Sequence, residues 1–403
     1  MDRTCKGLLA LAATLGASLA SAATPDEELG RRMDTAIERA IDEQRIVGTV
    51  VVVVMRDGQV VYQRAAGFAD REAARPMTGD TILRLASVTK PMVSAVAMRL
   101  VEQGTLSLDD TVSQWLPDFR PTLADGTQPP ITLKQLLTHT AGLSYGFLEA
   151  EHGAYRSAGV SDGLAEPGMS LEDNLKRIAS VPLSYPPGTQ WRYSMAIDVL
   201  GAVLEKASGK SLPTLTEELV TKPLDMNDTA FSVKDPARLG AVYRDDRPRP
   251  SRMQDEAAIR VGESTTRFSL QRIFDPRSYP SGGAGMAGTA MDVARFLDTL
   301  RQGGGPLLSA RSVQAMMTDQ VGAQAQTQGP GWGFGYGWAV LDDPALAGTP
   351  QSRGTLQWGG AYGHSWFVDP QARLTVVALT NTAFEGMSGA FTREIRDAAY
   401  PAP

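Results

Sequence analysis

The sequence is poor in the residues that build disulfides, thiol sites and metal sites. Its 403 residues include one cysteine, Cys5, which lies in a short apolar stretch at the N-terminus. Beyond that stretch the chain has neither a disulfide nor a thiol nucleophile. The three histidines, His139, His152 and His364, are not at metal-ligand spacing from one another. We therefore expect no metal site, and the sequence implies no organic cofactor.

Basic patches and long apolar runs are also missing. The formal net charge is −6, without a run of basic residues. An acidic chain of this kind lacks the electrostatic footprint of a nucleic-acid-binding protein. No apolar stretch reaches the length of about 20 residues that a membrane-spanning helix needs. We expect a small-molecule substrate, no nucleic-acid partner and no stable membrane span, while the oligomeric state stays open.

The first 22 residues are typical of an export signal. Arg3 and Lys6 form a short basic start, residues 7–20 are almost wholly apolar, and residues 20–22 (Ala-Ser-Ala) are small. This pattern predicts cleavage near Ala22 and a periplasmic or secreted protein. The alternatives are a membrane-tethering N-terminus, or a cytoplasmic protein if the signal is not used.

Strand patterns are present near both ends of the chain. Runs of β-branched and apolar residues occur at 49–55, 60–62, 365–368 and 374–379. The dipeptide Asp57-Gly58 between the first two runs is typical of a hairpin turn. Helical spacing occurs outside these strands, at 25–45 and 386–400. We predict an α+β fold in which one antiparallel sheet is assembled from both chain ends and flanked by helices.

The middle of the chain is helical and rich in loops. Apolar spacing predicts helices at 88–102, 133–138, 171–179 and 196–207. Residues 245–285 show little periodicity and many Arg, Pro and Ser residues, as a lid, a binding loop or a surface excursion would. We predict a sheet domain from 25–86 and 287–403, a mainly helical domain at 87–286, and an active site at their interface.

The strongest chemical candidate is the tetrapeptide Ser87-Val88-Thr89-Lys90. Such a Ser-x-x-Lys pair occurs by chance in long chains, but here an apolar helix follows, with Pro91 in its first turn. Lys90 lies on the same helical face as Ser87 and can reach it. Apolar surroundings favour the neutral amine, so Lys90 could act as a base near neutral pH. The alternative is an N-cap serine beside a solvated lysine.

Two further segments fit the same chemistry. Tyr193 lies in a turn that leads into a helix, where a phenol could relay a proton. Residues 358–361 (Trp-Gly-Gly-Ala) lie on or beside a strand, where glycines mark a close approach to the backbone. A main-chain N–H there could form an oxyanion hole with the N–H of Ser87. The alternatives are a core tyrosine and an ordinary bulge.

Together these segments resemble the serine β-lactamase and penicillin-binding-protein family, in its order and approximate spacing, over about residues 35–398. Residues 136–143 and 281–286 are similar to accessory signatures of that family. The resemblance implies a β-lactamase/transpeptidase-like fold and an acyl-enzyme on Ser87. It also implies that Lys90 and Tyr193 share the proton transfers, and that the backbone amides of Ser87 and Ala361 hold the oxyanion. Which of the two side chains is the primary base stays open.

Two departures from the family pattern narrow the function. Members usually carry Tyr-x-Asn, whereas the third residue here is Met195; they also carry Lys-Thr-Gly, whereas Trp358, Gly359 and Gly360 stand here. Both changes replace groups that recognise an anionic amide with apolar ones. The pattern resembles the β-lactamase-like carboxylesterases, called family VIII esterases. We therefore expect a carboxylesterase for short or medium acyl esters, with these four residues and Tyr145 at the substrate.

Several alternatives stay open. The export signal favours a β-lactamase or a D-alanyl-D-alanine carboxypeptidase, and an acyltransferase of the same fold would differ only in the acceptor alcohol. Ser144 lies in a Gly-x-Ser-x-Gly sequence with Asp342 and His364 downstream, as in α/β-hydrolases. That motif needs a strand before its serine, and a helix is predicted there instead. We interpret Ser144 as a decoy and His364 as a structural histidine.

Overall fold

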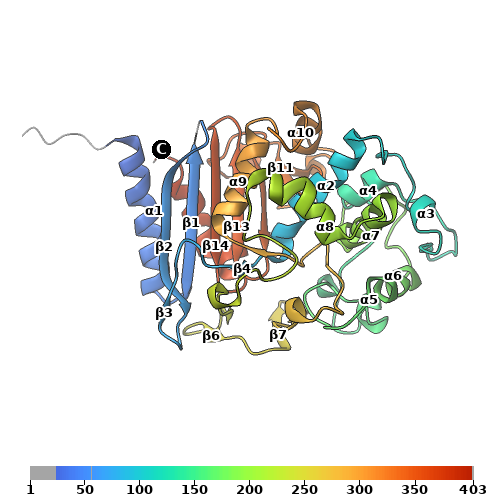
Figure 1. Ribbon diagram of the computed structural model, residues 1–403, viewed down its shortest axis with the longest axis horizontal. Helices are drawn as coiled ribbons and strands as arrows, with labels where there is room; N and C mark the ends of the chain where they lie inside the picture. The colour runs from blue at the N-terminus through green and yellow to red at the C-terminus, as the bar shows by residue number, and fades with distance from the viewer. Residues whose placement is uncertain (1–23, 56, 402–403) are drawn as a thin grey trace, which may run out of the picture.

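The computed structural model describes residues 24–55 and 57–401, so the predicted export signal at 1–22, with Cys5, lies outside the described residues. Within them the main element is an eight-stranded sheet in which every neighbouring pair is antiparallel (Figure 1). In spatial order the strands are β10 (Trp332–Phe334), β11 (Ala339–Leu341), β12 (Leu356–Gly360), β13 (His364–Asp369), β14 (Leu374–Thr380), β1 (Gly48–Met55), β2 (Gln59–Asp70) and β3 (Arg75–Pro76).

The two ends of the chain meet in the middle of this sheet. β1 pairs with β2 on one side and with β14 on the other, and Val52 lies opposite Val377. Every residue of β14 and all but the last of β1 are buried. The predicted α+β fold, with an antiparallel sheet built from both chain ends, is confirmed.

Helices cover both faces of the sheet and fill the rest of the molecule. They are α1 (Pro25–Asp42), α2 (Thr89–Glu102), α3 (Val112–Trp115), α4 (Leu133–Leu137), α5 (Ala154–Ser157), α6 (Leu171–Ser180), α7 (Ala196–Ser208), α8 (Leu212–Thr216), α9 (Ala290–Arg301), α10 (Ala310–Met317), α11 (Pro344–Ala347), α12 (Glu385–Ser388) and α13 (Ala390–Ala398). The helices predicted in the middle of the chain are confirmed as α2, α4, α6 and α7. The predicted closing helix is interrupted at Gly389, between α12 and α13.

The alternation of side chains along β1 explains the two layers. Val51 and Val53 point to the face covered by α1 and α13, whereas Val50 and Val52 point to the face covered by α2 and α9. Figure 1 shows α1 along the β1–β2 edge and α9 over the other face. Because α2 is apolar on all sides, it is buried from residue 89 to residue 98 and forms the centre of the larger core.

Residues 245–285, which were expected to form an irregular loop, contain regular secondary structure in part. It contains a hairpin of β7 (Ala257–Val261) and β8 (Ser264–Phe268), which follows the short pair β5 (Tyr243–Arg244) and β6 (Ser251–Arg252). A two-residue turn at 262–263 joins the hairpin strands, and Gly262 supplies its positive φ of 62°. The strands carry many polar residues, so an apolar periodicity could not reveal them.

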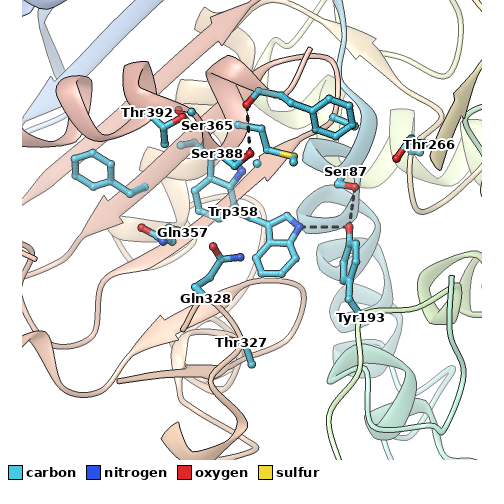
Figure 2. Close-up of a pocket in the computed structure, with 18 of the residues that line it drawn as sticks. Ser87, Tyr193, Thr266, Thr327, Gln328, Gln357, Trp358, Ser365, Ser388 and Thr392 are labelled. Carbon is cyan, nitrogen blue, oxygen red and sulfur yellow. Dashed lines mark hydrogen bonds between the residues drawn. The ribbon is translucent and has the colours of Figure 1, made fainter. Parts of the chain in front are cut away.

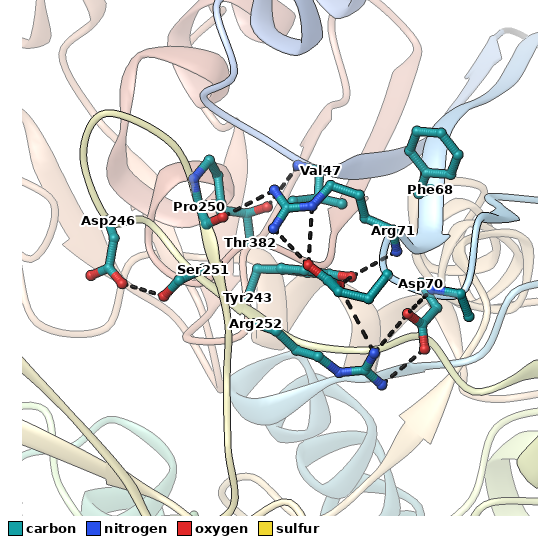
Figure 3. Close-up of polar contacts among 12 residues, drawn as sticks. Val47, Phe68, Asp70, Arg71, Tyr243, Asp246, Pro250, Ser251, Arg252 and Thr382 are labelled. Atoms are coloured by element: carbon teal, nitrogen blue, oxygen red, sulfur yellow. Dashed lines mark hydrogen bonds and ion pairs between the residues drawn. The ribbon is translucent and has the colours of Figure 1, made fainter.

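A polar network fixes the start of this stretch to the end of β2 (Figure 3). The Tyr243 hydroxyl accepts from the Arg71 N–H at 2.7 Å and donates to Glu72 at 2.6 Å. Arg252 donates twice to Asp70, at 2.8 Å each, and the Arg71 guanidinium donates to the Pro250 carbonyl at 3.0 Å. The segment that leads to the hairpin is therefore anchored rather than loose.

Short elements complete the described part of the chain. β4 (Leu83–Arg84) pairs with β9 (Ala287–Gly288), and the single-turn helices are Ala86–Val88, Gly146–Leu148, Glu217–Thr221, Lys222–Leu224, Pro236–Arg238, Arg272–Phe274 and Ala323–Ala325. None of the helices among the described residues combines the length and apolar character that a bilayer crossing requires.

A buried arginine joins the N-terminal and C-terminal helices. Arg45, which follows α1, donates to Glu43 at 2.8 Å, to Glu385 at 2.9 Å and to Glu394 at 2.7 Å. The side chains of Arg45 and Glu385 are 9% and 6% exposed. Each charge is therefore held by the other, and removal of one leaves its partner uncompensated in the interior.

We predict that Arg45→Met lowers the free energy of unfolding by about 3 kcal/mol, because the Glu385 carboxylate stays buried without its cation. Urea denaturation at neutral pH measures the loss. The matched control is Arg64→Met, because Arg64 pairs with Asp34, whose side chain is 43% exposed. That variant should lose less than about 1 kcal/mol. Equal losses in the two variants would contradict the role given to burial.

His364 joins the main sheet to the strand that precedes Ser87. Its ring is fully buried, and Nε2 lies 2.7 Å from the Arg84 carbonyl oxygen in β4. Burial lowers the pKa of His364 to about 4, against the opposing effect of the Arg84 carbonyl. The ring is therefore neutral near pH 7, and its Nε2–H donates to that carbonyl.

We predict that His364 makes the protein less stable in mild acid. Its ordinary pKa is 6.5, so the unfolded chain takes up a proton between pH 6.5 and 4 whereas the folded chain does not. Stability from this residue is complete above pH 6.5, and about 2 kcal/mol is lost between pH 7 and pH 5. Urea denaturation at both pH values should show a smaller loss for His364→Gln, which keeps a donor. An unchanged loss would rule His364 out as the titrating group.

Candidate active site

Ser87 is positioned by a tight turn directly before α2. Ala86 has a φ of 46°, in the left-handed region that non-glycine residues rarely adopt. Two hydrogen bonds hold the turn: the Leu85 N–H donates to the Met286 carbonyl at 2.8 Å, and the Met286 N–H donates to Thr89 Oγ1 at 3.1 Å. The helix cap is Val88, without a side-chain cap bond, so Ser87 Oγ is not used as a helix cap.

Two polar side chains donate to Ser87 Oγ, and Figure 2 shows one of them, Tyr193, between Ser87 and Trp358. The Tyr193 hydroxyl donates to Ser87 Oγ at 2.7 Å, and the Lys90 ammonium donates to it at 3.2 Å. Lys90 is fully buried and also donates to the Gly283 carbonyl at 2.8 Å. The Trp358 indole N–H approaches the Tyr193 hydroxyl at 3.4 Å. The serine thus lies within proton-transfer distance of both the amine and the phenol.

Aromatic rings enclose the Lys90 ammonium. Its nitrogen lies 4.6 Å from the ring centroid of Tyr193 and 5.3 Å from that of Tyr145. The Tyr145 ring is itself 5.0 Å from Tyr193 and stacks on Phe147 at 4.4 Å. The electron-rich faces of these rings stabilise a cation that has lost its water.

A buried carboxylate completes the surroundings of Lys90. Asp198, at 1% exposure, accepts from Ser281 Oγ at 2.6 Å through Oδ1, while Oδ2 has no hydrogen-bond partner among the described residues. A Cβ on Gly283 would lie 2.4 Å from Oδ2, 2.9 Å from the Tyr145 hydroxyl and 3.4 Å from Lys90 Nζ. The carboxylate and the ammonium are therefore within about 6 Å of each other, close enough to interact strongly.

Burial raises the pKa of Asp198, while the Ser281 hydroxyl and the charge of Lys90 act in the opposite direction. Sequence reasoning missed Asp198 and Gly283 as site residues. Both residues lie in segments that resemble the family. A single Asp or Gly, however, is not part of a motif with defined spacing, so the sequence alone does not single it out.

A cavity of about 770 Å³ opens at Ser87. Of the residues expected at the substrate, Tyr145, Trp358, Gly359 and Ala361 line it together with Ser87 and Tyr193. Figure 2 shows Trp358 beside Tyr193, with Gln357 and Thr392 further along the cavity. The other lining residues are Phe147, Leu148, Asp162, Leu164, Trp191, Arg192, Thr266, Ala284, Thr327, Gln328, Gln357, Ser365, Trp366, Phe367, Val376, Phe384, Met387, Ser388, Gly389, Thr392, Arg393, Ile395 and Arg396.

Two of the expected substrate residues do not line this cavity. Met195 is fully buried in the larger core at the start of α7, so its side chain serves packing there. Gly360 is also buried, and a Cβ on it would lie 2.4 Å from the Leu85 carbonyl oxygen. Its lack of a side chain lets β12 lie directly against the turn that carries Ser87.

The main-chain donors at the end of β12 are free. Ala361 follows β12 directly, and none of the described residues accepts a hydrogen bond from the N–H of Ala361 or of Ser87. Because β12 contacts the 86–88 turn, both groups belong to the same side of the cavity. Both residues line the cavity, so two free main-chain donors lie beside it.

The competing nucleophile lies outside the cavity. Ser144 is fully buried, and its Oγ donates to the Tyr145 carbonyl at 3.4 Å. The segment before it follows α4 rather than a strand. His139 accepts the Ser194 N–H at 3.2 Å through Nδ1, and burial holds its pKa well below 6.5. Among residues 24–55 and 57–401, no group of three or more His, Cys, Asp or Glu side chains could hold a metal ion.

Comparisons with known proteins agree with this architecture. A family model described as Beta-lactamase matches residues 33–400. "Esterase EstB" from Burkholderia gladioli is 51% identical over 375 residues, covering 92% of this chain and 95% of that protein. The solved structure of "EstCE1, a hydrolase with promiscuous acyltransferase activity" superposes with a TM-score of 0.91 at 48% identity, covering 93% of this chain and 99% of that one.

A solved structure of lower sequence identity shares the same fold. The octameric penicillin-binding protein homologue from Pyrococcus abyssi has a TM-score of 0.68 at 22% identity, covering 90% of this chain and 75% of that one. At that identity the likeness concerns the fold alone. Since one family model matches nearly the whole described chain and about half of the residues are shared with a full-length relative, the chain belongs to the Beta-lactamase family.

Proposed function

We propose that this protein is a serine carboxylesterase that cleaves short or medium acyl esters through an acyl-enzyme on Ser87. The main support for this proposal is that Ser87 Oγ accepts hydrogen bonds from both Tyr193 and the buried Lys90, at the edge of a cavity with aromatic walls. The relative at 51% identity is named an esterase, which supports the same activity. The substrate is accordingly a small molecule.

In the proposed mechanism, Ser87 Oγ attacks the ester carbonyl carbon while its proton passes to whichever of the two neighbours is in its basic form, the neutral Lys90 amine or the Tyr193 phenolate. The N–H groups of Ser87 and Ala361 stabilise the oxyanion that forms. The same proton then moves to the departing alcohol oxygen, which leaves the acyl group on Ser87. Water, deprotonated by the same pair, attacks the acyl carbon and regenerates the serine. Tyr193 at 2.7 Å and Lys90 at 3.2 Å are both near enough to take part.

The preference for neutral esters follows from what replaces the charged anchor of the family pattern. Trp358 occupies the position of the strand lysine and directs its indole N–H toward Tyr193 at 3.4 Å. Met195 stands where the family pattern has an asparagine, and its side chain has no amide and is buried in the core. A second question is which molecule accepts the acyl group. A structural neighbour is described as a hydrolase with promiscuous acyltransferase activity, which favours acyl transfer to alcohols, in place of water, as a side activity here. We further propose export, on the basic and apolar pattern of residues 1–22.

We predict that Ser87→Ala lowers the hydrolysis of p-nitrophenyl butyrate by at least about a thousandfold, because the nucleophile is lost. Ser144→Ala, the control, should keep most of the activity. A chromogenic cephalosporin is assayed in parallel and should be turned over far more slowly than the ester. Preferential cephalosporin cleavage would support the β-lactamase alternative, and full activity of Ser87→Ala would refute the assigned nucleophile.

We predict that Gly283→Ala lowers kcat for the same ester about tenfold or more, because the new methyl would lie 2.4 Å from Asp198 Oδ2 and 2.9 Å from the Tyr145 hydroxyl and would displace these neighbours of Lys90. The matched control is Gly30→Ala on α1, where the nearest atom to the new Cβ lies 3.7 Å away. That variant should keep its activity and gain slightly in thermal stability. Thermal melting of both variants separates a local displacement from a loss of the fold, and an unchanged kcat in Gly283→Ala would contradict the tight packing around Lys90.

A further inference from the structure

One ionisable side chain in the cavity has no part in the chemistry at Ser87. Asp162, in the segment between α5 and α6, is the single Asp or Glu among the described residues that line the cavity. Its Oδ1 accepts from the Gly146 N–H at 2.8 Å. No Lys or Arg of the described chain forms an ion pair with it. A half-buried carboxylate is thus held by backbone N–H groups, and the charge of Arg156 acts on it without a direct ion pair.

Asp162 lies close to the reacting serine. It contacts the backbone between Tyr145 and Phe147, since a Cβ on Gly146 would lie 3.2 Å from its Oδ2. The Tyr145 ring is 5.0 Å from the Tyr193 ring, and Tyr193 donates to Ser87. The Asp162 carboxylate therefore lies in the same cavity as Ser87, and the Tyr145 residue lies between it and Tyr193.

The surroundings of the carboxyl group are mostly apolar. Tyr145, Phe147, Leu148 and Leu164 line the cavity with it. The acyl chain that stays on Ser87 after the alcohol leaves would contact such walls. A carboxylate beside aromatic faces is an environment that binds an ammonium or another strong hydrogen-bond donor.

Burial sets the charge of this group near neutral pH. It raises the pKa of Asp162 to about 7, whereas the Gly146 N–H lowers it, the charge of Glu166 raises it and the charge of Arg156 lowers it. The guanidinium of Arg156 is bonded to the Thr265 carbonyl. The remaining ionisable groups that interact with Asp162 are the phenols of Tyr145, Tyr155 and Tyr279. Asp162 therefore changes from mostly neutral at pH 6 to mostly charged at pH 8.

We propose that Asp162 is a specificity residue that binds a hydrogen-bond donor, an ammonium in preference to a hydroxyl, on the acyl part of the ester. The inference rests on the proposed function and adds a substrate class to it: acyl chains with an amino group near their far end. In this scheme the aromatic walls bind the methylene groups, and the carboxylate binds the terminal nitrogen.

The test uses three p-nitrophenyl esters of similar length: heptanoate, 6-hydroxyhexanoate and 6-aminohexanoate. The quantity compared is the ratio of kcat/KM for the amino ester to kcat/KM for the heptanoate, because titration of Ser87, Lys90 and Tyr193 affects both substrates alike. In the wild type the ratio should rise several-fold from pH 6 to pH 8. In Asp162→Asn it should fall about tenfold at pH 8, equivalent to 1.4 kcal/mol, and lose its pH dependence. The hydroxy ester should lie between the other two.

Asn at position 162 keeps an oxygen for the Gly146 N–H, and thermal melting confirms that the variant is folded. The matched control is Asp125→Asn, an exposed carboxylate outside the cavity lining, which should leave the ratio and the basal activity unchanged. If Asp162→Asn does not fold, the wild-type measurement alone tests the proposal. A wild-type ratio of kcat/KM values that stays unchanged between pH 6 and pH 8 overturns it.

The two proposals fail in different ways. If the wild type does not hydrolyse the heptanoate, or if Ser87→Ala still does, the proposed esterase function is wrong. If heptanoate hydrolysis depends on Ser87 but wild type and Asp162→Asn give the same ratio, the function stands. Asp162 then serves only to accept the Gly146 N–H, and the inference is overturned.

Discussion

The burial of one ammonium group constrains the arrangement around Ser87. Lys90 is fully enclosed within the first turn of α2, and a charge in such a place is costly unless its hydrogens and its field are satisfied. The Gly283 carbonyl, Ser87 Oγ and two aromatic faces meet this need directly, and the Asp198 carboxylate does so through space. The contacts that satisfy the Lys90 amine are therefore the same ones that orient Ser87.

The fold supplies those contacts from distant parts of the chain. α2 is the buried axis of the larger core, β12 comes from the C-terminal part of the sheet, and the 281–286 segment connects to β9. The turn at Ala86 is held in a left-handed conformation between Met286 on one side and Gly360 on the other. His364 is hydrogen-bonded to the Arg84 carbonyl in β4, the strand that leads into this turn. A strained backbone persists only where its surroundings determine it fully, and these three contacts do so.

Much of this could be predicted from the sequence, because the fold and the central side chains obey spacing rules. β-branched runs at both ends predicted one antiparallel sheet assembled from both chain ends, in which β1 and β14 prove to be neighbours, and the interval from Ser87 to Lys90 predicted one helical face. What could not be predicted lacks such a rule. The hairpin of β7 and β8 has polar strands, and the inward packing of Met195 depends on the whole core rather than on its neighbours in the chain. Asp162 and Asp198 read as ordinary acidic residues until the fold places them in an apolar environment.

Those two carboxylates also show how the same physical effect can serve different ends. Burial raises the pKa of both side chains, because an apolar environment disfavours a negative charge. Asp198 is sealed next to Lys90, so its charge can act only on the ammonium and on the geometry of Ser87. Asp162 opens onto the cavity, so under the proposal its charge acts on whatever group the substrate brings. Access to the cavity, rather than acidity, therefore separates a carboxylate that can act only on Lys90 from one that, under the proposal, acts on the ester.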